Sequence, residues 1–259
     1  MKIVVRNGLS LWEFDGLSAL RGIRHFVTDR NTNPQGEPFT LSFSSTPDRA
    51  LVVNNRRLLA EAMRVDEQAL FLPSQVHKTH IVHVSPSTTK EELTETDALI
   101  TTHPDVCIAV MSADCVPIIL YDAKNKVVAA VHSGWRGTVA RILEKTLNEM
   151  HDRYGTIGAD VFAGIGPSVS QESYEVGLEV ITAVQASFDA HGELLVHTLP
   201  QKAKLDLWNA NRQQLLEFDV PDGHIEVSNL CTVIHNHAFF SARKGDAGRF
   251  AAGIMITDG

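Results

Sequence analysis

The sequence predicts an α/β fold: a single domain over residues 1–259, with a mixed β-sheet and helices packed on its faces. Short runs of Val, Ile, Ala and Leu alternate with longer segments in which apolar residues recur at helical spacing. The chain has no linker, internal repeat or low-complexity stretch that would divide it. Its 259 residues are enough to bury one substantial core.

The first part of the chain is expected to form strands, loops and one helix. Over the first forty residues, apolar stretches alternate with Gly, Asn and Pro, which favours strands and loops. A helix is predicted from Asp48 to Met63, because its apolar positions form one stripe. The β-branched residues of 75–84 favour a strand, and a polar, acidic loop follows over 85–95.

Three apolar segments are expected to form the centre of the sheet. Residues 97–102, 106–121 and 126–131 are rich in Val, Ile, Ala and Leu, as is typical of adjacent strands buried on both faces. A helix is predicted to begin at Gly137-Thr138 and to run to about Tyr154. The remaining elements expected are strands over 160–165, 225–231, 239–242 and 250–256, and helices over 176–188 and 206–218.

Composition and charge exclude several classes of function. The formal net charge is −8 and no Lys/Arg-rich stretch offsets it, so we expect no general nucleic-acid surface, although one or two arginines can still hold a small anion. No apolar run reaches the roughly 18 residues of a membrane span, and the N-terminus does not resemble a signal peptide. Three scattered cysteines make no disulfide framework. We expect a cytoplasmic protein, monomer or homodimer, with reduced thiols.

Three predicted strand ends carry side chains that can bind a metal. His77 ends Gln-Val-His, Cys115 lies in Ser-Ala-Asp-Cys-Val-Pro, and His132 begins His-Ser-Gly-Trp-Arg-Gly. If these edges converge, they supply two imidazoles and one thiolate, which zinc accepts tetrahedrally with the fourth position open to water. Taken singly, each residue is more often an ordinary buried cysteine or a core or surface histidine than a metal ligand, and the spacing matches no compact zinc pattern.

Two charged residues beside these strand ends allow alternative interpretations. Arg136 lies between Gly134 and Gly137, just before the predicted helix, where it would bind an anion or pair with a nearby carboxylate. Asp114 would shuttle protons or orient a histidine, and we favour the second role.

Longer motifs then make the chain resemble a known family. They are Gln-Val-His (75–77), Thr-Asp-Ala-Leu-Ile-Thr (96–101), Ala-Asp-Cys-Val-Pro-Ile (113–118), Val-His-Ser-Gly-Trp-Arg-Gly (131–137), Gly-Ile-Gly-Pro-Ser (164–168), Tyr-Glu-Val-Gly (174–177), Leu-Asp-Leu-Trp-x-Ala-Asn-Arg (205–212) and Phe-Phe-Ser-x-Arg (239–243). In this order they resemble the YfiH-type laccase-domain family. Its members are also called multicopper polyphenol oxidoreductases or peptidoglycan editing factors. The resemblance spans nearly the whole chain.

The resemblance implies a zinc enzyme that acts on purine nucleosides. Its expected reactions are phosphorolysis of adenosine, inosine, guanosine and methylthioadenosine, with purine nucleosides and phosphate as partners, and deamination of adenosine to inosine. The zinc ligands map onto His77, Cys115 and His132. The resemblance also favours the anion-binding role of Arg136. Further substrate contacts are expected at Arg56, Ser133 and Arg243.

Departures from the family pattern concern these substrate contacts. Thr40-Leu41-Ser42 replaces Asn-Leu-Ser, Val233-Ile234 stands where Tyr-Cys is common, and Arg243-Lys244-Gly245-Asp246 replaces Arg-Arg-Asp-Gly. They leave the three expected zinc ligands intact.

Three other functions compete with this expectation. A copper oxidase can use a His₂Cys site, but a multicopper enzyme also needs many His-x-His pairs, and this chain offers only His235-Asn236-His237, so copper is disfavoured. A cysteine-dependent amide hydrolase or deamidase, acting in peptidoglycan precursor editing, would use Cys115 as nucleophile and His132 as base. A non-enzymatic binding module is least favoured, because it needs no open metal position beside an arginine.

Overall fold

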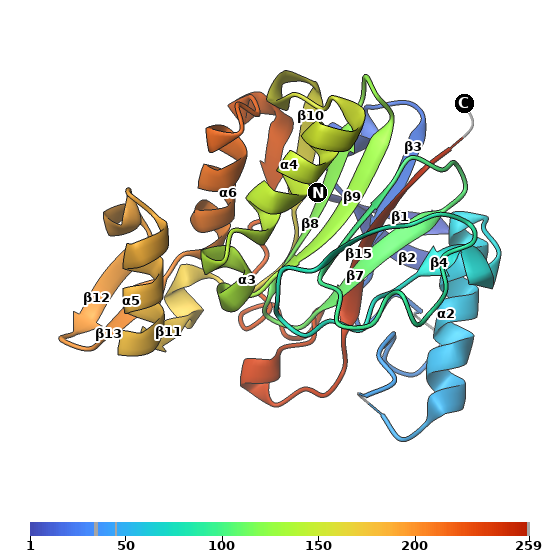
Figure 1. Cartoon of the computed structure of the whole chain (residues 1–259). Coiled ribbons are helices and arrows are strands. Elements are labelled where there is room, and N and C mark those ends of the chain that lie inside the picture. The colour runs from blue at the N-terminus through green and yellow to red at the C-terminus, as the bar shows by residue number, and fades with distance from the viewer. Residues whose placement is uncertain (34–35, 45, 258–259) are drawn as a thin grey trace.

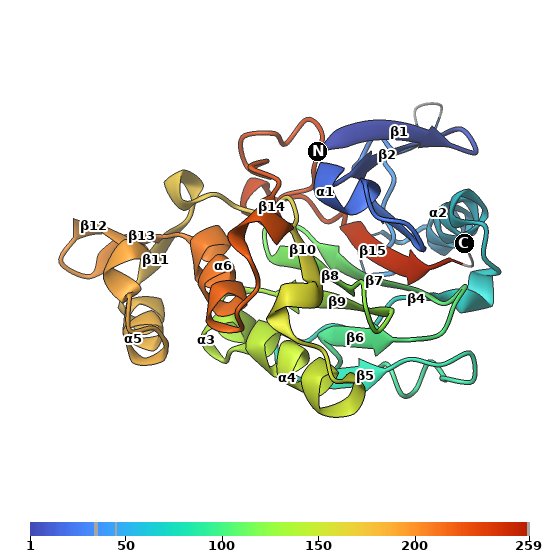
Figure 2. The ribbon, with the colours of Figure 1, turned by 90° about the horizontal axis from the view of Figure 1, so that it is seen from above.

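The computed structural model of the chain describes residues 1–33, 36–44 and 46–257. Two β-sheets stack face to face at its centre, and helices cover the outer face of each (Figures 1 and 2). The α/β class with mixed sheets is confirmed, but the central layer is two stacked sheets where we expected one. Whether the chain is a single domain stays a prediction.

Each of the two stacked sheets joins parallel and antiparallel strands. The first sheet has the order β1 (Lys2–Arg6), β2 (Leu9–Glu13), β3 (Ile23–Val27), β15 (Phe250–Ile256), β7 (Cys107–Ser112), β4 (Leu70–Phe71). The second has the order β14 (Ile225–Val227), β10 (Val161–Ile165), β8 (Val116–Asp122), β9 (Val127–Ser133), β6 (Ala98–Thr101), β5 (Ile81–His83). A small third sheet has the order β11 (Glu175–Gly177), β13 (Lys202–Leu205), β12 (Leu195–Leu199).

Helices lie on the outside of this sandwich. The α-helices are α1 (Asp15–Ser18), α2 (Arg49–Met63), α3 (Trp135–Val139), α4 (Ile142–Tyr154), α5 (Leu178–Ser187) and α6 (Leu207–Glu217). Short 3₁₀ helices cover Glu67–Ala69, Gly158–Asp160, Gln171–Ser173, His191–Glu193, Asp222–His224 and Ala242–Lys244. Helix α2 packs on the first sheet, and α4 and α6 pack on the second (Figure 1). Among the described residues, we find no helix both long and apolar enough to cross a membrane.

The central strands are buried on both faces because their side chains alternate between two cores. In β8, Ile118 and Leu120 enter the core beneath the helices, where Leu143 of α4 lies. Ile119, on the other face, enters the core between the sheets with Ile108 of β7. The expected burial on both faces is therefore confirmed, and a second sheet provides the partner for one of those faces.

Two helices begin close to the predicted residues, and each has an aspartate cap at its N-terminus. The Asp48 carboxylate accepts a hydrogen bond from the backbone N–H of Leu51 at the start of α2 (3.0 Å), which confirms the helix predicted over 48–63. The Asp206 carboxylate accepts from Asn209 N–H (2.9 Å) in the same way and starts α6.

Three predicted elements near the strand ends are wrong in part. The strand expected over 106–121 breaks at Asp114 (φ +91°) into β7 and β8, which belong to different sheets. Of the strand expected over 75–84, only Ile81–His83 forms, since the chain turns at His77 (φ +63°). The helix expected from Gly137 begins at Trp135 and is divided in two at Arg141 (φ +58°). All three breaks lie at backbone angles that single-residue propensities do not favour.

Smaller corrections concern the C-terminal half. No strand forms over 239–242, the strand expected over 225–231 ends at Val227, and the helix expected from Val176 begins at Leu178. The β12–β13 hairpin was not predicted.

Candidate active site

Three side chains from separate parts of the sequence meet at one end of the second sheet. The ligand atoms of His77, Cys115 and His132 all lie within 4.8 Å of one another, and we call them the His–Cys–His cluster. The antiparallel pairing of β8 and β9 sets Pro117 opposite His132, which brings Cys115 to the end of β9. His77 reaches the cluster from the turn before β5, with its ring centroid 4.9 Å from that of His132. The expected convergence of these strand ends therefore occurs.

The three residues of the cluster differ in their exposure to solvent. His77 is exposed, Cys115 is partly exposed, and His132 is 3% exposed. An incoming molecule therefore reaches the cluster from the His77 side, while His132 forms its buried floor.

Asp97, a fully buried residue just before β6, organises two of the three side chains. Its Oδ1 accepts from His132 Nδ1 (2.8 Å) and from the backbone N–H of His77 (3.0 Å). Its Oδ2 accepts from the N–H groups of Val76 (3.2 Å) and Lys78 (2.8 Å). Asp97 thereby fixes the ring of His132 through Nδ1, and holds the turn that carries His77 in its left-handed conformation.

Gly134 leaves the space that the cluster needs. A Cβ atom at this position would lie 2.8 Å from Cys115 Sγ and 3.1 Å from His77 Cδ2, closer than packed atoms approach each other. Because its φ is −71°, the requirement for glycine is one of space and not of backbone angle.

The charges of Cys115 and His132 depend on each other. Burial raises the pKa of the Cys115 thiol, but the combined effect of His132 and His77 is larger and brings this pKa down to about 6. Burial lowers the pKa of His132, but Cys115 and Asp97 raise it, to about 9. Without a metal, the two groups form a thiolate–imidazolium pair near neutral pH, and both shifts belong to this pair. Burial also raises the pKa of Asp97, but hydrogen bonds from His132 and from the Lys78 N–H hold it below its usual value.

Asp114 does not orient a histidine as expected, because its oxygens are used elsewhere. Its Oδ1 accepts from the Thr232 hydroxyl (2.6 Å), and its Oδ2 accepts from the backbone N–H of Arg243 (2.8 Å). Asp114 therefore fastens the C-terminal loop to the cluster, and Asp97 has the role that we had assigned to Asp114. The position of Asp97, just before an apolar strand, was the available signal.

Arg243 and Arg136 bring positive charge to the same edge. The Arg243 guanidinium donates to the Glu175 carbonyl (3.1 Å) and stacks on the Tyr174 ring, 4.7 Å from its centroid. Arg136 is exposed in the first turn of α3 and stacks on Trp135 at 4.3 Å. Within the ranges that the structure describes, no carboxylate pairs with Arg136, so an ion pair there is not seen.

Tyr174 links these arginines to the cluster, a role that sequence reasoning missed. Burial raises its pKa to about 12, with contributions from Cys115 and Asp114, while Arg243 and Arg136 act in the opposite direction. The phenol therefore stays protonated and can donate a hydrogen bond at neutral pH.

Arg56 and Ser133 make internal contacts. The Arg56 guanidinium donates through Nε (2.9 Å) and Nη2 (2.7 Å) to the Leu41 carbonyl, and burial lowers its pKa to about 10. Ser133 is fully buried, and its hydroxyl donates to Asn211 Oδ1 (2.8 Å). These bonds hold the 40–43 segment on α2 and join β9 to α6. Substrate contacts at both residues stay predictions.

The donor set of the cluster fits a zinc ion. One thiolate and two imidazoles are ligands that zinc prefers, and a partly exposed cluster leaves room for a fourth ligand. Within the described part of the chain, no second group of three His, Cys, Asp or Glu residues comes this close together. The rings of His235 and His237 lie 6.1 Å apart, outside this cluster.

Proteins of known sequence similar to this chain include enzymes of nucleoside metabolism. A purine nucleoside phosphorylase of Bacteroides thetaiotaomicron is 41% identical over 257 residues, covering 94% of this chain and 95% of its own. The adenosine deaminase RL5 of an unknown prokaryotic organism is 32% identical and covers 95% and 98%.

Solved structures and a family model agree with these relatives. YlmD from Geobacillus stearothermophilus superposes with a TM-score of 0.87 at 29% identity, and Bacillus licheniformis YfiH with 0.87 at 26%; each covers 97% of both chains. The model of the family described as multi-copper polyphenol oxidoreductase laccase matches residues 24–257. This chain belongs to that family, the laccase-domain family that its motifs resemble, and so to a group whose relatives are named as purine nucleoside phosphorylases and an adenosine deaminase.

Proposed function

We propose that this chain is a zinc-dependent purine nucleoside phosphorylase that also deaminates adenosine. Its substrates would be adenosine, inosine, guanosine and methylthioadenosine. The observation that carries the proposal is the meeting of the His–Cys–His cluster with two exposed guanidiniums, Arg136 and Arg243, beside Tyr174. The printed names of the relatives support the same chemistry.

In this proposal His77, Cys115 and His132 hold the zinc ion. When bound, zinc supplies Lewis-acid chemistry that polarises an oxygen or lowers the pKa of a water molecule. Asp97 keeps the His132 ring in place through its hydrogen bond to Nδ1, so that Nε2 faces the cluster.

For phosphorolysis, Arg136 and Arg243 bind phosphate through paired N–H groups. A phosphate oxygen then forms a bond to C1′ of the ribose while the C1′–N9 bond breaks, and the base leaves with a proton. For deamination, a water oxygen forms a bond to C6 and the amino nitrogen leaves as ammonia. The protonated phenol of Tyr174 donates a hydrogen bond to the bound purine or phosphate in either reaction.

The test joins metal analysis with turnover of adenosine, with and without phosphate, before and after chelation. We expect about one zinc per chain, with both zinc and turnover lost in His77→Ala and Cys115→Ala. His80→Ala is the matched control, because His80 is an exposed histidine three residues away that contacts Thr96. Free adenine that forms only with phosphate identifies phosphorolysis, and inosine that forms without phosphate identifies deamination. No bound metal and no nucleoside turnover would overturn the proposal.

A second function rests on the thiolate–imidazolium pair. Cys115 and His132 have the charge states of a cysteine hydrolase dyad when no metal is bound. An amide hydrolase that edits peptidoglycan precursors would keep its activity after chelation and lose it on alkylation of Cys115. The zinc enzyme would lose its activity on chelation, so chelation separates the two functions.

The proposal places the enzyme in the cytoplasm as a monomer or homodimer. Its three cysteines are free thiols, which suits a reducing compartment.

A further inference from the structure

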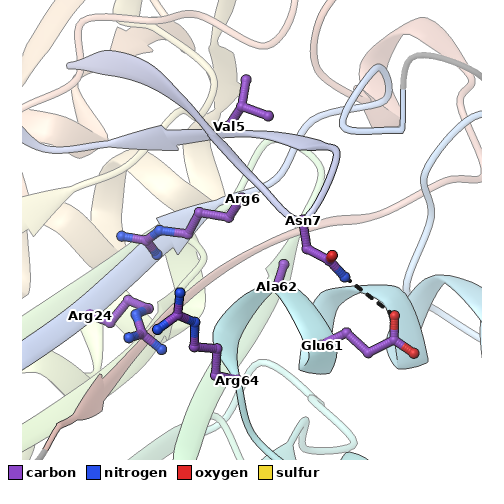
Figure 3. A pocket seen from close by; sticks show the side chains of 7 residues that line it. All are labelled: Val5, Arg6, Asn7, Arg24, Glu61, Ala62 and Arg64. Atoms are coloured by element: carbon purple, nitrogen blue, oxygen red, sulfur yellow. Dashed lines mark hydrogen bonds between the residues drawn. The ribbon is translucent and has the colours of Figure 1, made fainter.

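Three arginines from distant parts of the sequence converge on one pocket between the β1–β2 hairpin and the end of α2 (Figure 3). Arg6 ends β1, Arg24 lies in β3, and Arg64 follows α2 in a left-handed conformation (φ +59°). The pocket has a volume of about 480 Å³. Its lining residues, which define the arginine pocket, are Val5, Arg6, Asn7, Arg24, Glu61, Ala62 and Arg64.

The arginine pocket lies far from the His–Cys–His cluster. Arg24 pairs with Met255 of β15, and Met255 pairs with Cys107 at the start of β7. Cys115 follows the other end of β7, where Ser112 pairs with Phe250. Met255 and Phe250 are five residue steps apart along β15, which is roughly 16 Å of strand. A ligand in the arginine pocket therefore occupies a separate site.

Positive charge in the arginine pocket exceeds the negative charge that faces it. Glu13 pairs with Arg6, which also donates to the His25 carbonyl (3.2 Å), and Arg24 donates to the Met63 carbonyl. Within the described chain, the Arg64 guanidinium has neither a hydrogen bond nor an ion pair.

Glu61, the one carboxylate in the pocket lining, already has two partners. It pairs with Arg57 on α2 and accepts a hydrogen bond from Asn7 (3.4 Å). The three guanidiniums therefore outnumber the two nearby carboxylates, Glu13 and Glu61, which both already have partners, in a chain whose net charge is −8.

The electrostatic environment of Arg6 reflects this excess. Burial lowers its pKa, Glu13 raises it, and the neighbouring Arg24 and Arg64 lower it again, so that the net shift is downward. Guanidiniums that repel one another in a half-buried pocket become favourable when an anion joins them.

We propose that the arginine pocket binds the phosphate group of a phosphorylated small molecule. A phosphate offers several oxygens, so it can accept paired N–H groups from more than one guanidinium, which one carboxylate cannot do as fully. The volume falls within the range of about 300–1,000 Å³ that is usual for ligand pockets, which leaves space beside Val5 and Ala62 for the rest of the ligand.

The test follows the backbone amide signals of Val5, Asn7 and Ala62 by NMR during titration of the full-length chain. The probes are inorganic phosphate and ribose 5-phosphate, with ribose as the phosphate-free comparison. We expect these amides to shift and saturate with the phosphate probes and not with ribose. Tighter binding of ribose 5-phosphate supports the proposed sugar-phosphate class of ligand. Equal binding of inorganic phosphate would overturn that part and leave a site for the free anion.

The decisive variant is Arg64→Glu, because this exposed side chain makes no hydrogen bond that folding could need. Reversing its charge should weaken ribose 5-phosphate binding at least about tenfold, since a hydrogen bond to a charged group is lost. Arg153→Glu, on an equally exposed arginine of α4, should bind like the parent chain. Unchanged affinity in Arg64→Glu, with an unchanged melting temperature, would overturn the proposal. Nucleoside turnover should stay at the parent level, which separates this result from any failure of the proposed function.

Discussion

Two buried histidines in different regions of the molecule differ in charge: His132 is cationic and His25 is neutral at neutral pH. His132 in the cluster is 3% exposed and has its pKa raised to about 9, whereas His25 of β3 is 2% exposed and has its pKa lowered to about 3. Burial lowers both values. For His132, the thiolate of Cys115 and the carboxylate of Asp97 outweigh burial; for His25, the nearby Arg6 adds to it. Burial alone favours a neutral histidine, and His132 is charged because its anionic neighbours outweigh burial.

The same contrast describes the two regions as binding sites. In the His–Cys–His cluster, two anionic groups, Cys115 and the neighbouring Asp97, flank one cationic histidine, so a bound cation can replace a proton of His132. The arginine pocket holds guanidiniums that outnumber its carboxylates, and the nearby His25 is neutral because burial lowers its pKa and Arg6 lowers it further. One region is prepared for a cation and the other for an anion, although the whole chain is acidic.

Replacing Asp97 by asparagine is expected to have the largest effect, because it tests whether the negative charge beside His132 is needed for cation binding at the His–Cys–His cluster. The Asp97→Asn change would keep the shape of the side chain but remove the charge that holds His132 and part of the bonding to the His77 turn. We expect zinc affinity to fall about 100-fold, the upper end for partners of metal-bound histidines. Competition with a chromophoric chelator measures this affinity, and adenosine turnover should fall with it.

Asp122→Asn serves as the control for this change. Asp122 is also fully buried and accepts the N–H groups of Lys124 (3.0 Å) and Asn125 (2.9 Å), but at the far end of β8. Loss of zinc affinity in both variants would point to general destabilisation, and an unchanged affinity in Asp97→Asn would remove Asp97 from our account.

Alkylation of Cys115 by iodoacetamide tests its thiolate directly. In the metal-free protein, its pKa of about 6 predicts a reaction that is half-maximal near pH 6 and lost below it, where the thiol is protonated. At pH 6 the rate should exceed that of free cysteine about tenfold, after allowance for the lower nucleophilicity of a low-pKa thiolate. Peptide mapping by mass spectrometry separates Cys115 from Cys107, which is fully buried with its pKa raised to about 12.

Zinc should protect Cys115 in the same experiment, since a thiol bound to a metal does not attack the reagent. An alkylation profile centred near pH 9 would contradict the ion pair between Cys115 and His132.

Gly134→Ala tests whether the spacing of these charged groups matters as well as their presence. The added methyl group would press on Cys115 Sγ and His77, so the cluster must open slightly. An overpacking cost of about 1 kcal/mol corresponds to roughly fivefold weaker zinc binding. Gly192→Ala, where a Cβ meets no neighbour within 4 Å, is the matched control. Equal zinc affinity in the two variants would show that the cluster tolerates the displacement.

Local signals in the sequence were enough for some of these features. Helix α2 carries its own apolar stripe and its cap, Asp48, and β15 lies where the segment 250–256 was predicted. The convergence of the cluster was also predictable, because each of its three residues lies in a short motif beside an apolar run. Their role as zinc ligands stays a prediction.

Features that depend on distant residues could not be predicted in this way. The turn at His77 needs Asp97, twenty positions later, to accept its N–H groups, so residues 75–80 read as strand on their own. The break at Asp114 is stabilised by Thr232 and Arg243, more than a hundred positions away. The arginine pocket likewise exists only after folding, since Arg6, Arg24 and Arg64 are isolated in the sequence.

The smallest effect we predict is the pH dependence of stability that comes from His25, the buried histidine near Arg6. Its neutral Nε2 accepts the N–H of Phe14 (2.9 Å), and its folded pKa of about 3 lies below the ordinary value of 6.5. The unfolded chain therefore binds more protons between these two values. The contribution of His25 is complete above pH 6.5 and is lost progressively as the pH falls toward 3. From pH 7 to pH 6 the loss is about 0.7 kcal/mol.

His25→Gln removes this titration and keeps a hydrogen-bond acceptor, so urea unfolding of the variant should show a smaller fall in stability between pH 7 and pH 6 than the parent chain. His224→Gln, which changes a partly exposed histidine stacked on Phe162, is the control for the effect of a histidine-to-glutamine change itself. If the parent and His25→Gln lose equal stability over this range, His25 is not held neutral. The contrast with His132 would then fail, because His25 would be protonated in spite of its burial and of the nearby Arg6.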